Sequence, residues 1–130
     1  MRRAACSCGQ LSATCVGEPV RVSVCHCLNC KRRSGSAFSW NARWPADQVV
    51  VEGRAAEFTL TGDEGGRAAM SFCPDCGTTV YYRADTMPEF VITPAGCFAD
   101  PQFPQPAVSV YDPFRRCAWV DIQADPLERF

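Results

Sequence analysis

The 130-residue sequence has no long apolar run. Arg, Asp, Glu or Pro interrupts every stretch before it reaches the roughly 18 apolar residues of a membrane span. The first residues, MRRAACSCGQLSATC, also lack the apolar segment of roughly 7 to 15 residues that a secretory signal peptide contains. We therefore expect a cytoplasmic protein in a reducing compartment, without membrane contact.

The sequence also lacks an excess of either charge. Its 13 basic and 14 acidic residues give a net charge of -1, whereas a general nucleic-acid binder usually carries a basic excess. Nucleic acid is therefore not an expected partner. The composition, with 47% hydrophobic and 21% charged residues, fits a single folded domain over residues 1–130.

Helical periodicity over ten residues is absent, and short β-branched or aromatic runs recur between turn clusters instead. Strands are predicted at 20–24, 49–51, 57–60, 69–72, 78–82, 90–93 and 118–122. The glycine-rich segment 61–66 predicts a hairpin loop, and the proline-rich segment 99–106 predicts a surface crossing. The expected fold class is mainly β.

Cysteine, by contrast, is abundant, with 10 residues in the chain. Clustered cysteines in a reducing compartment are more often metal ligands than disulfides. The segment CPDCG at 73–77 is the clearest zinc-binding pattern, because two thiolates three positions apart around a tight turn can reach one ion. Three cysteines stand apart from the clusters and are expected to be small buried side chains: Cys15, Cys97 and Cys117.

The clustered cysteines divide naturally into four and three. A structural zinc takes four protein ligands, whereas a zinc with three protein ligands keeps an open position, so two zinc ions per chain are predicted. The spacing favours Cys6 and Cys8 with Cys73 and Cys76, which leaves Cys25, Cys27 and Cys30 as the second site. It also permits a zinc-ribbon pairing of Cys27 and Cys30 with Cys73 and Cys76, although the interval exceeds the usual ribbon spacing of about 15 to 20 residues.

A zinc held by three thiolates favours thiol chemistry. Three negative ligands weaken the power of zinc to acidify water, so hydrolysis is not expected. A small thiol suits such a soft site, and zinc would hold it as a nucleophilic thiolate at neutral pH. Two alternatives stay open: a non-enzymatic zinc module that contacts protein or nucleic acid through a basic surface, and a thiol redox sensor.

Residues beside the second cluster add candidate functions. His26 could carry a proton, replace a cysteine as ligand, or have a structural role. Lys31, Arg32 and Arg33 could bind the carboxylates of a thiol such as glutathione, or could form a solvated turn. Ser34 begins an SGS segment whose backbone N–H groups could face an anion.

Three segments occur in a fixed order: CSCG at 6–9, CHCLNCKRRSGSAF at 25–38 and FCPDCGT at 72–78. Together they resemble the glutathione-dependent formaldehyde-activating enzyme family, which also includes centromere protein V. The tail at 117–127 resembles the closing strand and turn of that family. The resemblance implies a β-tent fold of antiparallel sheets, with a structural zinc and a catalytic zinc. Their implied ligands are Cys6, Cys8, Cys73 and Cys76 for the first and Cys25, Cys27 and Cys30 for the second.

The resemblance also implies a reaction. Members of the family are classed with carbon-sulfur lyases and join formaldehyde reversibly to the thiol of glutathione, giving S-hydroxymethylglutathione. Zinc is then the implied cofactor, and glutathione and an aldehyde are the implied partners. One departure from the family pattern lies at Pro106, which relatives often follow with a histidine that this chain lacks.

Overall fold

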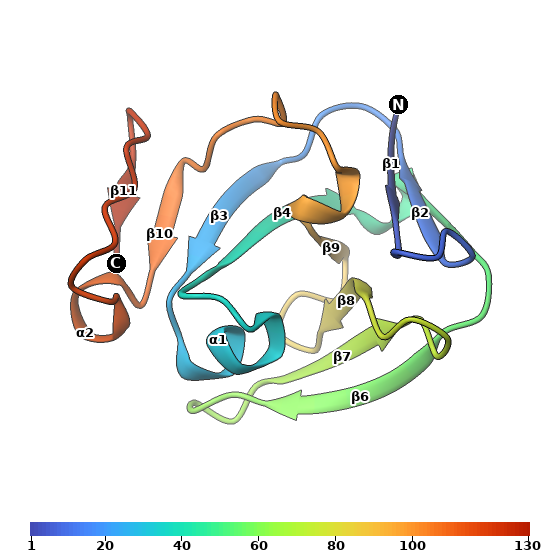
Figure 1. Cartoon of the computed structure of the whole chain (residues 1–130), viewed down its shortest axis with the longest axis horizontal. Coiled ribbons are helices and arrows are strands. Elements are labelled where there is room, and N and C mark those ends of the chain that lie inside the picture. The colour runs from blue at the N-terminus through green and yellow to red at the C-terminus, as the bar shows by residue number, and fades with distance from the viewer.

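The computed structural model describes residues 1–130 and contains eleven strands and a few short helices (Figure 1). The strands are β1 Arg2–Ala5, β2 Ser12–Cys15, β3 Arg21–Cys25, β4 Ser39–Pro45, β5 Val49–Glu52, β6 Ala56–Thr61, β7 Arg67–Phe72, β8 Thr79–Ala84, β9 Phe90–Pro94, β10 Val108–Val110 and β11 Glu128–Arg129. The helices are α1 Leu28–Ser34 and α2 Asp112–Arg115, with short 3-10 helices η1 Ala46–Gln48 and η2 Ala95–Phe98.

The strands form two sheets. The smaller has the order β1-β2-β5, and the larger has the order β11-β10-β3-β4-β9-β8-β7-β6. Pairing is antiparallel except that β10 runs parallel to both β3 and β11. The mainly β prediction is confirmed, but the larger sheet is mixed rather than purely antiparallel. No helix is long and apolar enough to span a membrane.

Six of the seven predicted strands correspond to β3, β5, β6, β7, β8 and β9, and segment 61–66 joins β6 to β7 as a hairpin loop. The strand predicted at 118–122 is wrong. The backbone turns there, because Val120 N–H donates to the Cys117 carbonyl and Arg116 holds the Val120 carbonyl. Val120 is buried, whereas the neighbouring Trp119 is 80% exposed. The apolar residues of segment 118–122 therefore do not pair with a sheet.

Helix α1 was not predicted, because seven residues are too few to display a helical period. It begins after Cys27, whose extended backbone and sulfur cap the first turn by accepting a hydrogen bond from Cys30 N–H at 3.2 Å. It ends at Gly35, which adopts a left-handed conformation with φ 68°. The helix lies over the side of the larger sheet formed by β6, β7 and β8 (Figure 1).

The hydrophobic core is small, since 26 of 130 residues are buried. One buried cluster surrounds the cysteine-bearing loops and consists of Ala4, Cys6, Leu11, Ala13, Cys73 and Val80. The other surrounds Trp44 and consists of Cys15, Val22, Ala42, Trp44, Ala95 and Phe103. Phe103 comes from the proline-rich crossing and stacks on Phe98 at 4.7 Å between ring centroids. The hydrophobic contribution to stability therefore comes from a small number of side chains.

Gly53 lets two distant loops approach each other. Its φ is +99°, and a Cβ there would lie 2.0 Å from the Gln10 carbonyl oxygen. The Gln10 side chain in turn pairs with the backbone of Arg54, accepting from its N–H at 2.9 Å and donating to its carbonyl at 2.8 Å. Gln10 Nε2 also lies 2.9 Å from Cys73 Sγ. The close approach at Gly53 therefore positions a hydrogen-bond donor on a cysteine sulfur.

We predict that Gly53→Ala lowers the free energy of unfolding by more than about 2 kcal/mol, because it combines a strained φ with a backbone clash. Urea denaturation followed by circular dichroism measures the change. Gly96→Ala is the matched control, because a Cβ at Gly96 meets nothing within 4 Å and its φ is not positive. Equal stability of the two variants would contradict the role given to Gly53.

Candidate metal centres

Four cysteine sulfurs from two distant parts of the chain converge. The Sγ atoms of Cys6, Cys8, Cys73 and Cys76 all lie within 4.8 Å of one another. Cys8 Sγ is 3.6 Å from both Cys6 Sγ and Cys73 Sγ, which is too long for a disulfide. Sulfurs bound tetrahedrally at about 2.3 Å from one zinc would be about 3.8 Å apart. The four sulfurs thus have the spacing that a single zinc ion needs.

Hydrogen-bond donors surround these sulfurs. Leu11 N–H donates to Cys6 Sγ at 3.3 Å, and Asp75 N–H donates to Cys73 Sγ at 3.4 Å. Hydrogen bonds from the side chain and backbone of Thr78 lower the pKa of the Cys76 thiol to about 5. Donors of this kind stabilise the thiolate form, which is the form that binds a metal.

The second group consists of Cys25, Cys27 and Cys30, whose sulfurs also lie within 4.8 Å of one another. We call these three residues the cysteine trio. Cys25 ends β3 and is buried, whereas Cys27 and Cys30 flank the start of α1 and are partly exposed. Hydrogen bonds with Cys25 and Cys30 lower the pKa of Cys27 to about 2. Hydrogen bonds with Cys27 and Cys30, together with burial, raise the pKa of Cys25. The arrangement concentrates negative charge at Cys27.

The structure groups the cysteines as four and three, in the first of the two pairings weighed from the sequence. The ribbon-like pairing of Cys27 and Cys30 with Cys73 and Cys76 is not formed. Four thiolates suit a closed tetrahedral zinc site, and three leave one position for another ligand. The residues present therefore fit a zinc ion at each group.

A cavity of about 390 Å³ opens beside the cysteine trio. Cys27, Cys30 and Arg33 line it from the α1 side, and the opposite walls come mainly from β6, β7 and β8. A second cavity of about 380 Å³ adjoins it and shares Asn29, Arg33, Leu60 and Met70. Two of the three cysteines are therefore accessible to a small molecule.

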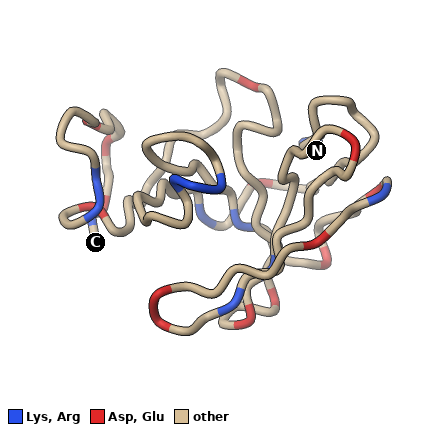
Figure 2. The backbone as a smooth tube through the Cα atoms, turned by 60° about the horizontal axis from the view of Figure 1, so that its bottom comes forward, with Lys and Arg blue, Asp and Glu red and all other residues tan.

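The basic residues after the trio differ in their surroundings. Lys31 Nζ contacts the Arg115 carbonyl and lies 3.4 Å from Cys117 Sγ, so it ties α1 to the C-terminal segment. Ser34 Oγ donates to the Cys30 carbonyl at 2.7 Å and stays within the helix. Arg32 is exposed and borders only the second cavity. The basic residues 31–33 are in the last turn of α1, where positive charge complements the helix dipole. In Figure 2 Lys and Arg positions along the backbone are blue.

Arg33 is the basic residue that lines both cavities. Its guanidinium carbon lies 5.9 Å from the centroid of the Tyr82 ring, a cation–π distance. Its Nε atom is buried and has no hydrogen-bond partner. No carboxylate forms an ion pair with Arg33. Arg33 is thus a cation available to an anionic ligand.

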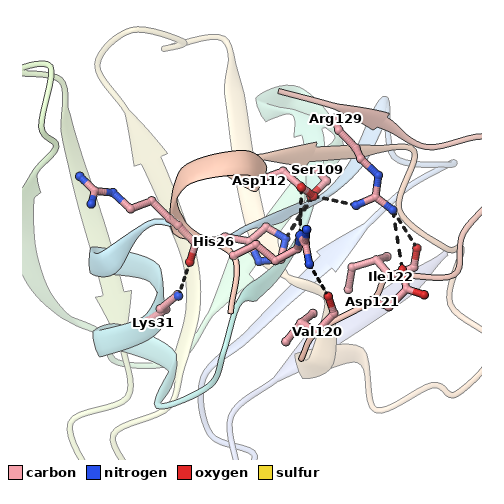
Figure 3. A network of polar contacts seen from close by, with 10 residues as sticks. His26, Lys31, Ser109, Asp112, Val120, Asp121, Ile122 and Arg129 are labelled. Atoms are coloured by element: carbon pink, nitrogen blue, oxygen red, sulfur yellow. Dashed lines mark hydrogen bonds and ion pairs between the residues drawn. The ribbon is translucent and has the colours of Figure 1, made fainter. Parts of the chain in front are cut away.

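His26 is fully buried and belongs to a network of polar contacts with Ser109 and Asp112 (Figure 3). Its Nε2 is 3.0 Å from Ser109 Oγ, and Ser109 donates its hydroxyl hydrogen to Asp112 at 2.6 Å. Since Ser109 gives its one hydrogen to Asp112, His26 Nε2 must donate to Ser109 Oγ, and the buried Nδ1 has no hydrogen-bond partner. Burial lowers the pKa of His26. The negative charge of Asp112 acts in the opposite direction, and the positive charge of Lys31 lowers the pKa further. The imidazole is therefore neutral and held in one tautomer.

Asp112 is the centre of this network. It is 3% exposed and accepts hydrogen bonds from Arg116 Nε at 3.1 Å and Arg129 Nη1 at 2.9 Å, besides the one from Ser109. Burial opposes its ionisation, but the hydrogen bonds from Ser109, Arg116 and Arg129 outweigh this and lower its pKa. Asp112 thus links the C-terminal strand β11 to the segment that carries the trio.

Sequence reasoning missed several of these supporting residues. Gln10 directly follows the CSCG segment, so its position offered a signal for a group that contacts the cysteines. Ser109 and Asp112 offered none, because their partner His26 is more than eighty positions away along the chain. The isolated cysteines behave as expected for Cys15, which is buried, whereas Cys97 and Cys117 are only half-buried. Burial raises the pKa of both Cys15 and Cys97 to about 11.

These features define a small, mainly β protein with two groups of cysteines that could each hold a metal ion. The model of the family described as glutathione-dependent formaldehyde-activating enzyme matches residues 1–113, and the chain belongs to that family. The match ends before 117–127, so it does not include the tail that we compared with the closing strand of the family.

The fold is similar to the crystal structure of a Rhodobacter sphaeroides protein, with a TM-score of 0.57 and 19% sequence identity. The similarity covers 73% of this chain and 85% of that one, and it concerns the fold alone. A search of curated proteins found no match.

We predict that Asp112→Asn lowers the free energy of unfolding by about 3 kcal/mol at neutral pH, because it leaves two arginines beside a buried neutral amide. The native pKa of Asp112 is depressed, so its stabilisation is present above the unfolded pKa of about 3.9 and is lost as pH falls through the native value. Denaturation curves between neutral and acid pH test both points.

The matched control is Asp121→Asn. Asp121 also faces Arg129, at 4.0 Å, but its side chain is 72% exposed. It should lose at most a few tenths of a kcal/mol. An Asp112→Asn variant no less stable than Asp121→Asn would contradict the central position of Asp112 in the network.

Proposed function

We propose that this protein is a zinc-dependent enzyme of the carbon-sulfur lyase type, which adds a small thiol, glutathione in the first instance, reversibly to formaldehyde or a related aldehyde. The family supports glutathione-dependent formaldehyde activation in general. The observation that carries the proposal is the difference in the number of cysteines: four thiolates complete a tetrahedral zinc site, whereas the trio leaves one position, and two of its members line a cavity together with Arg33.

In this proposal the group of four is structural. Cys6 and Cys73 belong to a hydrophobic cluster, and the four residues join the first loop of the chain to the loop before β8. Zinc bound there would crosslink residues more than sixty positions apart. Residues 1–130 would then form one domain of the β-tent type, working in the reducing cytoplasm where the cysteines stay reduced.

The cysteine trio is the proposed catalytic site. Zinc held by Cys25, Cys27 and Cys30 would supply the positive charge that keeps a substrate thiol ionised at neutral pH. The trio orients that sulfur toward the cavity, and Arg33 binds a carboxylate of the thiol. In the reaction a carbon–sulfur bond forms, the carbonyl π bond breaks, and the oxygen takes up one proton. Nothing is oxidised or reduced.

Lys31, Ser34 and His26 take supporting roles in this proposal. The first two are engaged by Arg115 and Cys30, so we assign them to the position of α1 and not to direct substrate contact. The full burial of His26 favours a positioning role over proton transfer with substrate. The same contacts weigh against the binding-module alternative, since Lys31 is withdrawn from the basic surface.

We predict two zinc ions per folded chain, measured by elemental analysis after purification under reducing conditions. Cys27→Ser should lose one zinc and keep its circular dichroism spectrum, because Cys27 is partly exposed and lies outside the hydrophobic clusters. Cys97→Ser is the control and should keep both. A Cys27→Ser protein that retained two zinc ions would refute the assignment of the trio.

Cys73→Ser should instead prevent folding, because a domain with a small core depends on its structural metal. Chelation of zinc from the wild type should likewise abolish the cooperative thermal transition, whereas Cys97→Ser should melt like the wild type. Scanning calorimetry measures both. A soluble Cys73→Ser protein with a normal transition would show that the group of four does not stabilise the fold.

Thiol binding is tested with Co²⁺ in place of zinc. Glutathione should increase the thiolate-to-cobalt charge-transfer absorption of the wild type and change its d–d bands, but should leave Cys27→Ser unchanged. S-methylglutathione, which has no free thiol, is the matched control. Spectra that ignore glutathione would rule out the proposed function, and zinc release on mild oxidation would then favour the redox-sensor alternative.

A further inference from the structure

The cavity beside the trio is larger and more apolar than formaldehyde requires. Its walls carry Leu60, Met70, Met87 and the rings of Tyr82 and Tyr111, around a volume of about 390 Å³. Formaldehyde has no hydrocarbon group to bury, so these side chains contribute nothing to its binding. The volume and the walls point to a different carbonyl compound.

The body of glutathione does not explain the apolar wall either. The few polar side chains at the cavity are Asn29, Arg33, Arg67 and Thr86. Glutathione carries charged and amide groups along its whole length, and these would lose their hydration against the methionines without gaining partners. The peptide thiol therefore fits beside Arg33, and the apolar part of the wall remains for another group.

The floor of this apolar part is made by small side chains. Ala68 of β7 and Ala84 of β8 are register partners in the sheet, and both line the cavity. Larger side chains at these two positions would fill the space opposite Cys27 and Cys30. The cavity therefore depends on the small side chains of two alanines that are paired across neighbouring strands.

We propose that the carbonyl substrate of this chain is an aldehyde with a hydrocarbon chain or ring, which packs against Leu60, Met70 and Met87. The inference rests on the proposed function, since the aldehyde meets the substrate thiol that zinc at the trio would hold. The bond changes are those of the formaldehyde reaction, and the hydrocarbon group takes no part in them. Each additional buried methylene should favour binding about fourfold.

Binding is tested without turnover by methionine-methyl NMR of the zinc-loaded protein. The chain has 3 methionines: Met70 and Met87 line the cavity, and Met1 is 91% exposed and lies elsewhere. Hexanamide is the probe, because it carries a hydrocarbon chain and a carbonyl that does not react with thiols. Formamide is the matched control without the chain.

Hexanamide should shift the Met70 and Met87 resonances with saturation and leave Met1 unchanged, whereas formamide at the same concentration should shift none of them. Failure of hexanamide to move either cavity methionine would overturn the inference. Equal shifts at Met1 would overturn it as well, because they would indicate non-specific contact.

Selectivity is tested by exchange NMR, which measures the rate of adduct formation with glutathione for formaldehyde, butanal and hexanal, with the uncatalysed rate subtracted. The wild type should favour hexanal over formaldehyde. Ala68→Leu should lower that preference at least tenfold by filling the floor of the cavity. Ala69→Leu is the matched control, since Ala69 follows on the same strand and lies outside the cavity.

Circular dichroism checks that both variants fold. If Ala68→Leu does not, the aldehyde series on the wild type and the methionine shifts decide the question. A wild type that prefers formaldehyde, or equal preference in folded Ala68→Leu and Ala69→Leu, contradicts the inference.

The inference and the proposed function fail in different ways. Cobalt spectra that respond to glutathione, with no hexanamide shift at Met70 or Met87, would leave the function intact and remove the apolar aldehyde. Hexanamide shifts with cobalt spectra that ignore glutathione would leave an apolar ligand site and remove the thiol chemistry.

Discussion

The convergence of four cysteine sulfurs is the constraint on which the rest of the structure depends. Cys6 and Cys8 come from the first turn of the chain, and Cys73 and Cys76 come from the loop before β8. Only 26 residues are buried, so hydrophobic burial alone gives this domain a modest driving force. The surrounding loops pack closely against this group: Gly53 contacts the backbone of Gln10, and the Gln10 side chain donates to Cys73 Sγ.

The larger sheet then builds the second centre from a different set of elements. β3 delivers Cys25, the first turn of α1 delivers Cys27 and Cys30, and β6 to β8 provide the facing wall of the cavity. Asp112 accepts hydrogen bonds from Ser109, Arg116 and Arg129. His26 in turn donates to Ser109, so this network fixes the segment between Cys25 and Cys27. One group of cysteines therefore joins the first loop of the chain to the loop before β8, and two members of the other group line a cavity.

The sequence predicted those features that depend on local chemistry. Cysteine spacing separated the chain into groups of four and three, and β-branched runs located six strands correctly. The strand at 118–122 failed because its apolar residues serve one turn, with Val120 as the anchor, and do not pair with a neighbour. Short elements such as α1 and β11 had too few residues to display a period.

The rest depended on contacts between distant residues. The sequence around His26 does not predict its contact with Ser109 or the nearby Asp112. The sequence around Arg33 does not predict its contact with the ring of Tyr82. The basic run at 31–33 looked uniform in the sequence, yet its members face a carbonyl, solvent and a cavity. These roles depend on how the strands pair in the folded sheet, and strand pairing is not evident from a single amino-acid sequence.

The central claim is that the two centres differ by one open ligand position, and zinc K-edge X-ray absorption of the two-zinc protein tests it most directly. The account predicts a mixture of one all-sulfur site and one site with three sulfurs and a lighter ligand, with the lighter ligand replaced by sulfur when glutathione is added. Two all-sulfur sites before addition, with no change afterwards, would contradict it.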